Sequence, residues 1–169
     1  MSYETVFGSI GQYEKGGVEV IDADPKHYVF SNVFEVASLS KPYEKVAVGK
    51  NIKYVIETMR AEGDSPWFTA SHDEAALVMD GEIDVHLVKP DRPLVPDTTE
   101  GSVQLAGKPA GQAMGWIRAT RGHMALLPKG AAYQFHARTP GVLILQTIQG
   151  AHTVEKWADI CQTTQGEDR

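Results

Sequence analysis

The stretch from Trp67 to Val88 constrains the fold of this chain more than any other part of the sequence. It holds a short apolar run, Ala75 to Met79, and an alternating run, Glu82 to Val88, with Asp80-Gly81 between them. An Asp-Gly pair between two such runs favours a tight β-hairpin. We therefore predict two strands joined by a two-residue turn, with the rest of the chain forming a barrel around this hairpin.

The first of these strands carries polar side chains toward one face. His72, Glu74 and Ala76 share that face because side chains alternate with a period of two along a strand. If the face lines the inside of a barrel, an imidazole and a carboxylate are buried there. Such groups are costly unless they are hydrogen-bonded, charge-paired or bound to a metal. Their partners therefore decide what the protein does.

The length and composition are those of one globular domain. The chain has 169 residues, of which 42% are hydrophobic and 22% are charged, so we expect residues 1–169 to form a single domain with a substantial core. The net charge of −6 and the pI near 5.5 leave no concentrated basic face for phosphates. We therefore expect no nucleic-acid partner.

The sequence also argues against a membrane or a disulfide. No apolar segment approaches the roughly 20 residues that span a bilayer, and the first residues lack a basic stretch followed by an apolar one. We expect a cytoplasmic protein. Cys161 is the only cysteine, so an internal disulfide is impossible.

The remaining segments favour short strands separated by turns. Residues 1–17 read as an N-terminal arm, and residues 89–114 as a long loop with a short strand at Ser102 to Leu105. The spacing of apolar residues in 51–62 fits either a helix or a strand, and we favour a strand. Strands are also predicted at 18–21, 27–36, 41–48, 116–121, 124–127, 132–137 and 142–148. A turn at Thr139 to Gly141 separates the last two.

The end of the chain predicts the one convincing helix, residues 153–162. Thr153 is a suitable N-cap, and Val154, Trp157 and Ile160 share one face with Cys161. The pattern as a whole indicates an all-β barrel or sandwich with this helix at its end.

Two spacings resemble the signature motifs of the cupin superfamily. Glu74 is followed after six residues by Gly81, and Gly122 after five residues by Pro128 and then Gly130. The resemblance implies a cupin-type β-barrel, or jelly roll. In cupins the first motif supplies two histidines and a glutamate and the second a histidine, which together hold a metal inside the barrel.

Most of these ligand positions are changed in this chain. Residues 67–70 read WFTA where the first motif has its histidines, and Tyr133 takes the place of the second motif's histidine. Only Glu74 remains, and His136 falls on the opposite face of an ideal strand from Tyr133. A metal needs about three protein ligands, so Glu74 would need His72 together with His123 or His136. We favour a barrel that has lost its metal, in which Tyr133 hydrogen-bonds Glu74.

Three longer runs resemble the small subunit of two-component hydroquinone 1,2-dioxygenases. They are HYVFSNVFEVASLSKPYEKVAVGKNIKYVIE, SPWFTASHDEAALVMDGEIDVHLVKP, and LLPKGAAYQFHA with the following GVLILQTI, and the likeness extends from about Ile21 to Cys161. It implies a heterotetramer of two small and two larger cupin subunits, with Fe(II) in the larger one and no metal in this chain. The implied reaction opens the ring of hydroquinone with O2 to give 4-hydroxymuconic semialdehyde.

Under this resemblance the small subunit would form part of the wall and entrance of the substrate pocket. Trp67 is then the first candidate to reach toward the substrate or the subunit contact, followed by Phe68 and His72, while Glu74 and Tyr133 form a degenerate barrel centre. Simple core packing is the competing interpretation of Trp67.

Two other functions remain open at this point. One is a metal-free cupin homodimer that binds a small acid or sugar through His72, Glu74 and Tyr133. The other is a self-sufficient metalloenzyme with unusual ligands. Oligomeric state and metal content distinguish these from the supporting subunit.

Overall fold

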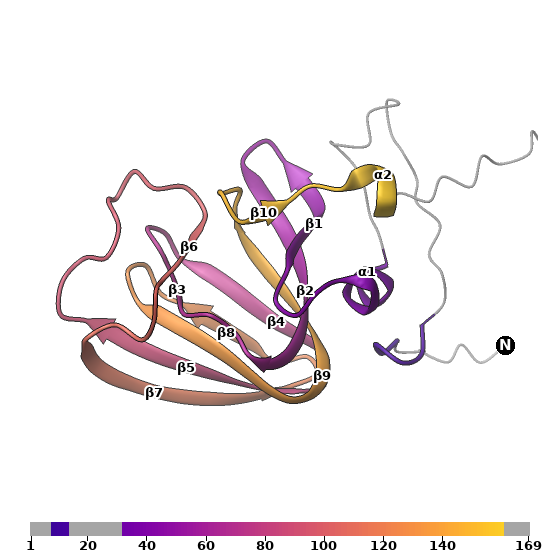
Figure 1. The fold of residues 1–169 in the computed structure, drawn as a ribbon, viewed down its shortest axis with the longest axis horizontal. Helices are drawn as coiled ribbons and strands as arrows, with labels where there is room; N and C mark the ends of the chain where they lie inside the picture. Colours follow the sequence, from indigo (N-terminus) through magenta and orange to yellow (C-terminus); the bar gives the residue numbers. More distant parts are fainter. Residues whose placement is uncertain (1–7, 14–31, 161–169) are drawn as a thin grey trace, which may run out of the picture.

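The computed structural model describes residues 8–13 and 32–160, which form a curled, mostly β structure (Figure 1). Its helices are α1 (Val33–Leu39) and α2 (Trp157–Ile160). Its strands are β1 (Lys45–Asn51), β2 (Tyr54–Asp64), β3 (Phe68–Ala70), β4 (Glu74–Asp80), β5 (Glu82–Pro90), β6 (Ser102–Gln104), β7 (Gly111–Thr120), β8 (Met124–Leu127), β9 (Ala132–Ile148) and β10 (Thr153–Val154).

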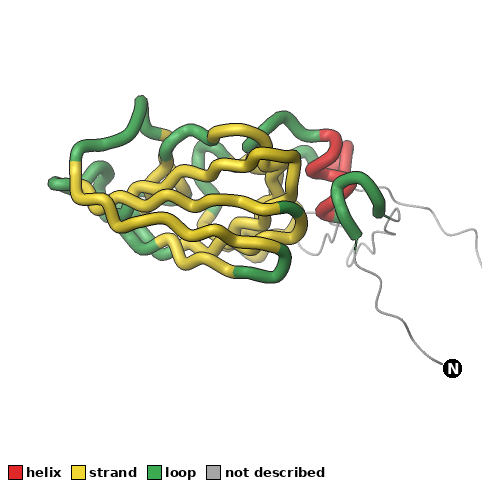
Figure 2. The backbone as a smooth tube through the Cα atoms, turned by 90° about the horizontal axis from the view of Figure 1, so that it is seen from below, coloured by secondary structure: helices red, strands yellow, loops and turns green. Residues whose placement is uncertain are grey.

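The strand β9 joins the two halves of the sheet. Its C-terminal part lies between β2 and β4, which gives a first layer in the order β10-β1-β2-β9-β4-β8. Its N-terminal part lies between β3 and β5, which gives a second layer in the order β6-β3-β9-β5-β7. The sheet curls so that the layers face each other (Figures 1 and 2). The prediction of a mostly β structure is therefore confirmed, but the chain also contains the helix α1, which was not predicted.

The central hairpin prediction is wrong in its pairing, although both strands exist. β4 pairs with β8 and β9, whereas β5 pairs with β7 and β9, so the turn at Asp80-Gly81 carries the chain from one layer to the other. Gly81 has a positive φ of 84°, and a Cβ added there would lie 3.1 Å from the Cα of Gly141. The two glycines allow the corner and β9 to approach closely.

The predicted turn at Thr139 to Gly141 is also wrong, because β9 continues through it. A register shift between Ala61 and Gly63 on the neighbouring β2 accompanies the passage of β9 from one layer to the other. A bulge bends a strand and interrupts its hydrogen-bond ladder only locally, so β9 pairs with β2 on both sides of the bend.

The N-terminal strand predicted at 27–36 is wrong over its described part, because α1 begins at Val33. The side-chain oxygen of Asn32 accepts hydrogen bonds from the backbone N–H groups of Phe34 (3.0 Å) and Glu35 (3.3 Å). This cap favours a helix over the strand that the Val and Phe content suggested. The predicted strand at 18–21 and most of the predicted arm lie outside the described residues.

The strand interpretation of residues 51–62 is confirmed by β2, and the short strand near Ser102 by β6. The strand predicted at 116–121 begins earlier, at Gly111, and so takes in the end of the predicted loop. The strands predicted at 41–48 and 124–127 correspond to β1 and β8.

The predicted C-terminal helix is wrong at its start. Thr153 and Val154 form β10, which pairs in parallel with Lys45 and Val46 of β1, and within the described residues 153–160 the helix covers only Trp157–Ile160. Thr153 caps no helix, because its hydroxyl donates to Glu57. Cys161 lies outside the described residues.

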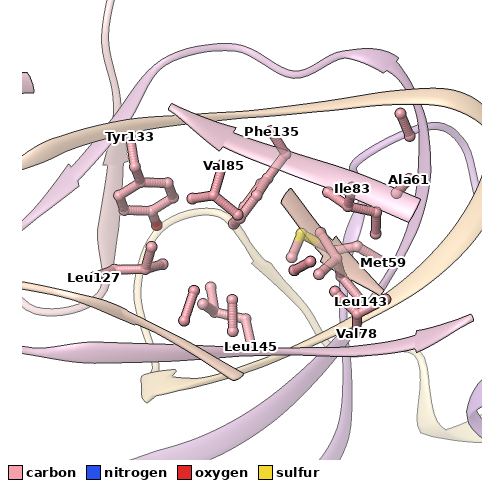
Figure 3. Close-up of a cluster of buried hydrophobic side chains, with 14 of the residues drawn as sticks. Met59, Ala61, Val78, Ile83, Val85, Leu127, Tyr133, Phe135, Leu143 and Leu145 are labelled. Atoms are coloured by element: carbon pink, nitrogen blue, oxygen red, sulfur yellow. The ribbon is translucent and has the colours of Figure 1, made fainter. Parts of the chain in front are cut away.

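The hydrophobic core fills the space between the layers. Figure 3 shows Tyr133, Val85 and Phe135 on one side, facing Leu143 and Leu145 on the other. Within the described part of the chain, no helix has the length and apolar character needed to cross a membrane.

Candidate functional site

A buried carboxylate, Glu74, lies at the centre of the candidate site. It points into the barrel from β4 beside Ala76 and is 2% exposed. The Tyr133 hydroxyl donates to its Oε2 (2.6 Å) and the Thr147 hydroxyl donates to its Oε1 (2.6 Å). The hydrogen bond between Tyr133 and Glu74 expected from the sequence is therefore present, and both oxygens of the carboxylate are occupied.

His72 joins this cluster from the bend before β4. Its Nε2 lies 2.9 Å from the Thr147 hydroxyl oxygen and 4.0 Å from Glu74 Oε1. The backbone N–H of Ile148 also donates to this Nε2 (3.4 Å), so two groups of β9 hold the imidazole in place. The Nδ1 atom of His72 is buried and has no hydrogen-bond partner among the described residues.

A buried lysine, which the sequence did not reveal, lies on the same side of the barrel. Lys45 of β1 is 2% exposed, and its Nζ donates to the hydroxyl of Ser102. The same Nζ lies 4.0 Å from the centre of the Phe68 ring and 6.0 Å from that of Tyr133. Burial lowers the pKa of Lys45, and the nearby carboxylates of Glu74 and Glu57 act in the opposite direction.

Glu57 of β2 is a second buried carboxyl group and is 1% exposed. Its Oε1 accepts a hydrogen bond from the Thr153 hydroxyl (2.6 Å), while its Oε2 has no partner among the described residues. Burial raises the pKa of Glu57, and Lys45 opposes that shift. Burial is also the main reason that the pKa of Tyr133 is raised well above its usual value, with Glu74 adding to it.

These residues do not fit a metal ion. Both Glu74 oxygens already accept hydrogen bonds, and the side chain of Lys45 is buried in the same interior. His136 points outward from β9, where its Nδ1 lies 2.6 Å from Asp64, and His123 is exposed beside Thr120. Among residues 8–13 and 32–160, no three His, Cys, Asp or Glu side chains cluster in a way that could hold a metal.

The structure separates the two aromatic candidates. Phe68 points into the barrel and stacks on Tyr133, with ring centres 5.9 Å apart. Trp67 lies on the outer face, where it packs with Val88 and Ala132 under the long loop. Trp67 is only 9% exposed. Phe68, His72, Glu74 and Tyr133 are thus brought together, and Trp67 is not.

The long loop borders a cavity of about 480 Å³ at one end of the barrel. Its wall includes Arg92, Leu94 and Met114 and, from the turn of the second motif, Pro128 and Lys129. Lys129 also pairs with Asp97 of the loop (3.0 Å). The loop is therefore tied to the turn that follows β8.

Among the residues that sequence analysis missed, two had a usable signal. Glu57 alternates with Val55 and Met59, and Thr147 alternates with Leu143 and Leu145, so a period of two places both on the buried face. Lys45 had no such signal, because its burial depends on how β1 is placed in the barrel.

Comparison with known proteins identifies relatives of nearly the same length. No protein-family model and no curated protein sequence matches the chain. A chain of hydroquinone 1,2-dioxygenase PnpCD, solved with Cd2+ and 4-hydroxybenzonitrile, is 53% identical, with 96% of this chain and 98% of that chain covered and a TM-score of 0.86. A chain of hydroquinone 1,2-dioxygenase from Sphingomonas sp. TTNP3, solved with 4-hydroxybenzoate bound, is 56% identical, with 96% and 99% covered and a TM-score of 0.88.

A second kind of chain in PnpCD shares only the fold. In the PnpCD complex with Fe3+, the match covers 82% of this chain but 37% of that chain, at 14% identity and a TM-score of 0.55. That chain is therefore about twice as long as this one. Because the close relatives match over their whole length and accompany a longer chain, this protein belongs to the family of small subunits of two-component hydroquinone 1,2-dioxygenases.

Proposed function

We propose that this chain is the supporting subunit of an iron-dependent dioxygenase that opens the ring of hydroquinone to give 4-hydroxymuconic semialdehyde. The observation that carries the proposal is the 53–56% identity to dioxygenase chains over 96% of this chain. Identity of this degree over nearly the whole length supports a shared role.

In this proposal the longer chain holds the ferrous iron, and two copies of each chain assemble. The support is that PnpCD has been solved with Fe3+ and contains a longer chain, while the barrel interior here combines Lys45 with a fully hydrogen-bonded Glu74. We also assign this barrel to the cupin class. Iron supplies the redox chemistry of ring opening in the longer chain, and no step passes through this one.

The substrate class is supported by the small molecules in related structures. PnpCD has been solved with 4-hydroxybenzonitrile, and the Sphingomonas enzyme with 4-hydroxybenzoate and 4-nitrophenol. All three are phenols with a substituent opposite the hydroxyl, as in hydroquinone. We propose that Trp67, Phe68 and His72 help to shape or support the wall of the substrate pocket.

A metal-free binding barrel draws less support from the geometry. The polar groups that would recognise a small acid, Glu74 and Tyr133, are hydrogen-bonded to each other. A ligand would have to break this buried, charge-assisted bond before it bound.

Reconstitution tests the proposed function. This chain and the longer chain are purified separately, and formation of 4-hydroxymuconic semialdehyde from hydroquinone and O2 is followed by absorbance. We expect no product from this chain alone, and rapid product formation when the two chains are combined. The control replaces this chain with the same amount of heat-unfolded chain. Equal activity of the longer chain with and without this chain would contradict a supporting role.

A further inference from the structure

The outward side of the first layer is unusual, because apolar residues occupy it. Val55, Glu57 and Met59 of β2 point inward, so Tyr54 and Ile56 point outward. Strand pairing extends this outward side across the layer. One row contains Ile56, Gln146, Ala75 and Leu126, and the next contains Thr58, Ile144, Leu77 and Met124. Neither row contains a charged residue.

The second layer provides an internal comparison. One of its outward rows contains Arg118, Asp84, His136 and Asp64. Arg118 donates two hydrogen bonds to Asp84 (2.8 and 3.0 Å), and His136 pairs with Asp64. An antiparallel layer that faces water has polar residues on its outer side. The charged row of the second layer follows this rule, although the next outward row places exposed Trp116 beside His86. The two rows of the first layer contain no charged residue.

The helix α1 covers only one end of the first layer. Val36 of α1 packs on Val46 and Val48 of β1, and the Thr58 hydroxyl faces the carbonyl of Val33. Beyond α1 the strands carry exposed apolar side chains. We call the outward side of the first layer beyond α1 the apolar face. It is made of Tyr54, Ile56, Leu77, Met124, Leu126 and Ile144.

The apolar face is large enough for a specific contact. Tyr54, Ile56, Met124 and Leu126 are 64%, 40%, 66% and 59% exposed. Together these four side chains present roughly 450 Å² of surface, as much as the largest apolar patch on a typical monomer. A stable complex buries about 800 Å² on each partner, so these side chains would supply about half of one side.

A cavity makes the surface concave at the edge of the apolar face. It has a volume of about 340 Å³ and lies between Tyr54, Leu126 and Ile148, with His72 in its wall. A concave site beside exposed apolar side chains can receive a side chain of a binding partner.

From these observations we infer that the apolar face is the surface on which the longer chain of the same enzyme docks. This inference rests on the proposed function, since it requires a two-chain enzyme. The longer chain is the appropriate occupant because the related PnpCD pairs a chain like this one with a chain about twice as long. The contact would be a largely apolar one, with the charged rows of the second layer left in water.

Two substitutions test the inference. Leu126→Glu and Ile56→Glu place a carboxylate on the apolar face without altering the core, because both side chains point outward. The matched control is Leu39→Glu, which makes the same kind of change at the end of α1, where the side chain is 76% exposed. Each variant is titrated against the tagged longer chain of this enzyme, and thermal unfolding confirms that it is folded.

We expect the dissociation constant to rise on the order of 100-fold for Leu126→Glu and Ile56→Glu, and to stay unchanged for Leu39→Glu. Wild-type affinity in both test variants would overturn the inference while leaving the proposed function intact. It would also be overturned if wild-type chain alone formed a dimer that Leu126→Glu dissociated, since the face would then join two copies. If wild-type chain failed to bind the longer chain at all, the proposed function itself would fall.

Discussion

Replacing Tyr133 by phenylalanine should lower the free energy of unfolding by about 1.5–3 kcal/mol, the usual value of a hydrogen bond to a charged group. The hydroxyl of Tyr133 is buried and donates to Glu74 Oε2 at 2.6 Å. Its loss leaves a carboxylate oxygen in the barrel without a donor, while the ring keeps its contacts with Phe68 and Phe135. For a chain of this size the melting temperature should fall by roughly 4–10 °C.

Two other tyrosines provide a graded control for this measurement. The Tyr43 hydroxyl donates to the carbonyl of Gly63 (2.6 Å), a neutral acceptor, so Tyr43→Phe should cost about 1 kcal/mol. The Tyr54 side chain is 64% exposed, so Tyr54→Phe should change the stability of the isolated chain very little. Chemical unfolding of the three variants measures the loss in the free energy of unfolding for each and so ranks them directly. If Tyr133→Phe were no more costly than Tyr54→Phe, Glu74 would not depend on Tyr133.

Replacing Trp67 by phenylalanine should reduce hydroquinone turnover by the assembled enzyme on the order of tenfold, because small displacements near a substrate pocket are costly. Trp67 packs with Val88, Leu94 and Leu105, and Lys108 lies 5.9 Å from the centre of its ring. Alanine would leave a cavity in this cluster, whereas phenylalanine keeps much of the apolar volume. Turnover and thermal stability are measured on the same complex.

Trp157 supplies the matched control. It is 7% exposed against 9% for Trp67, so the two substitutions remove indoles of similar burial. Trp157→Phe should lower the thermal stability of the complex about as much as Trp67→Phe, in part because the indole N–H of Trp157 donates to Glu155 (2.9 Å). It should leave the turnover of hydroquinone unchanged. Equal effects of the two variants on turnover would mean that Trp67 is ordinary packing.

The sequence predicted individual strands better than it predicted their partners. The sequence favoured a strand over residues 51–62, where β2 lies, even though the spacing of Val55, Ile56 and Met59 also fits a helix. The Asp80-Gly81 pair could not show that β4 and β5 enter different layers, since a hairpin and a corner both use a tight turn with a positive-φ glycine. Strand pairing is a tertiary property that the turn sequence does not encode.

The candidate site was predictable only in part, and for a similar reason. The motif spacing placed Glu74 and Tyr133 close enough to bond, and they do. A lysine in a strand normally indicates the solvent side. Lys45 is instead buried, because β1 enters the barrel beside Phe68 and Ser102. No local sequence pattern predicts such a contact between segments that are far apart in the chain.

We propose that this chain supports ring cleavage without carrying the iron. The most direct test of this proposal is the iron content of this chain and of the longer chain, each purified separately after expression in iron-supplemented medium. We expect near-stoichiometric iron in the longer chain and only a trace in this one, whose Glu74 is hydrogen-bonded on both oxygens in an interior that also holds the buried Lys45. Near-stoichiometric iron in this chain alone would show that the iron is not confined to the longer chain.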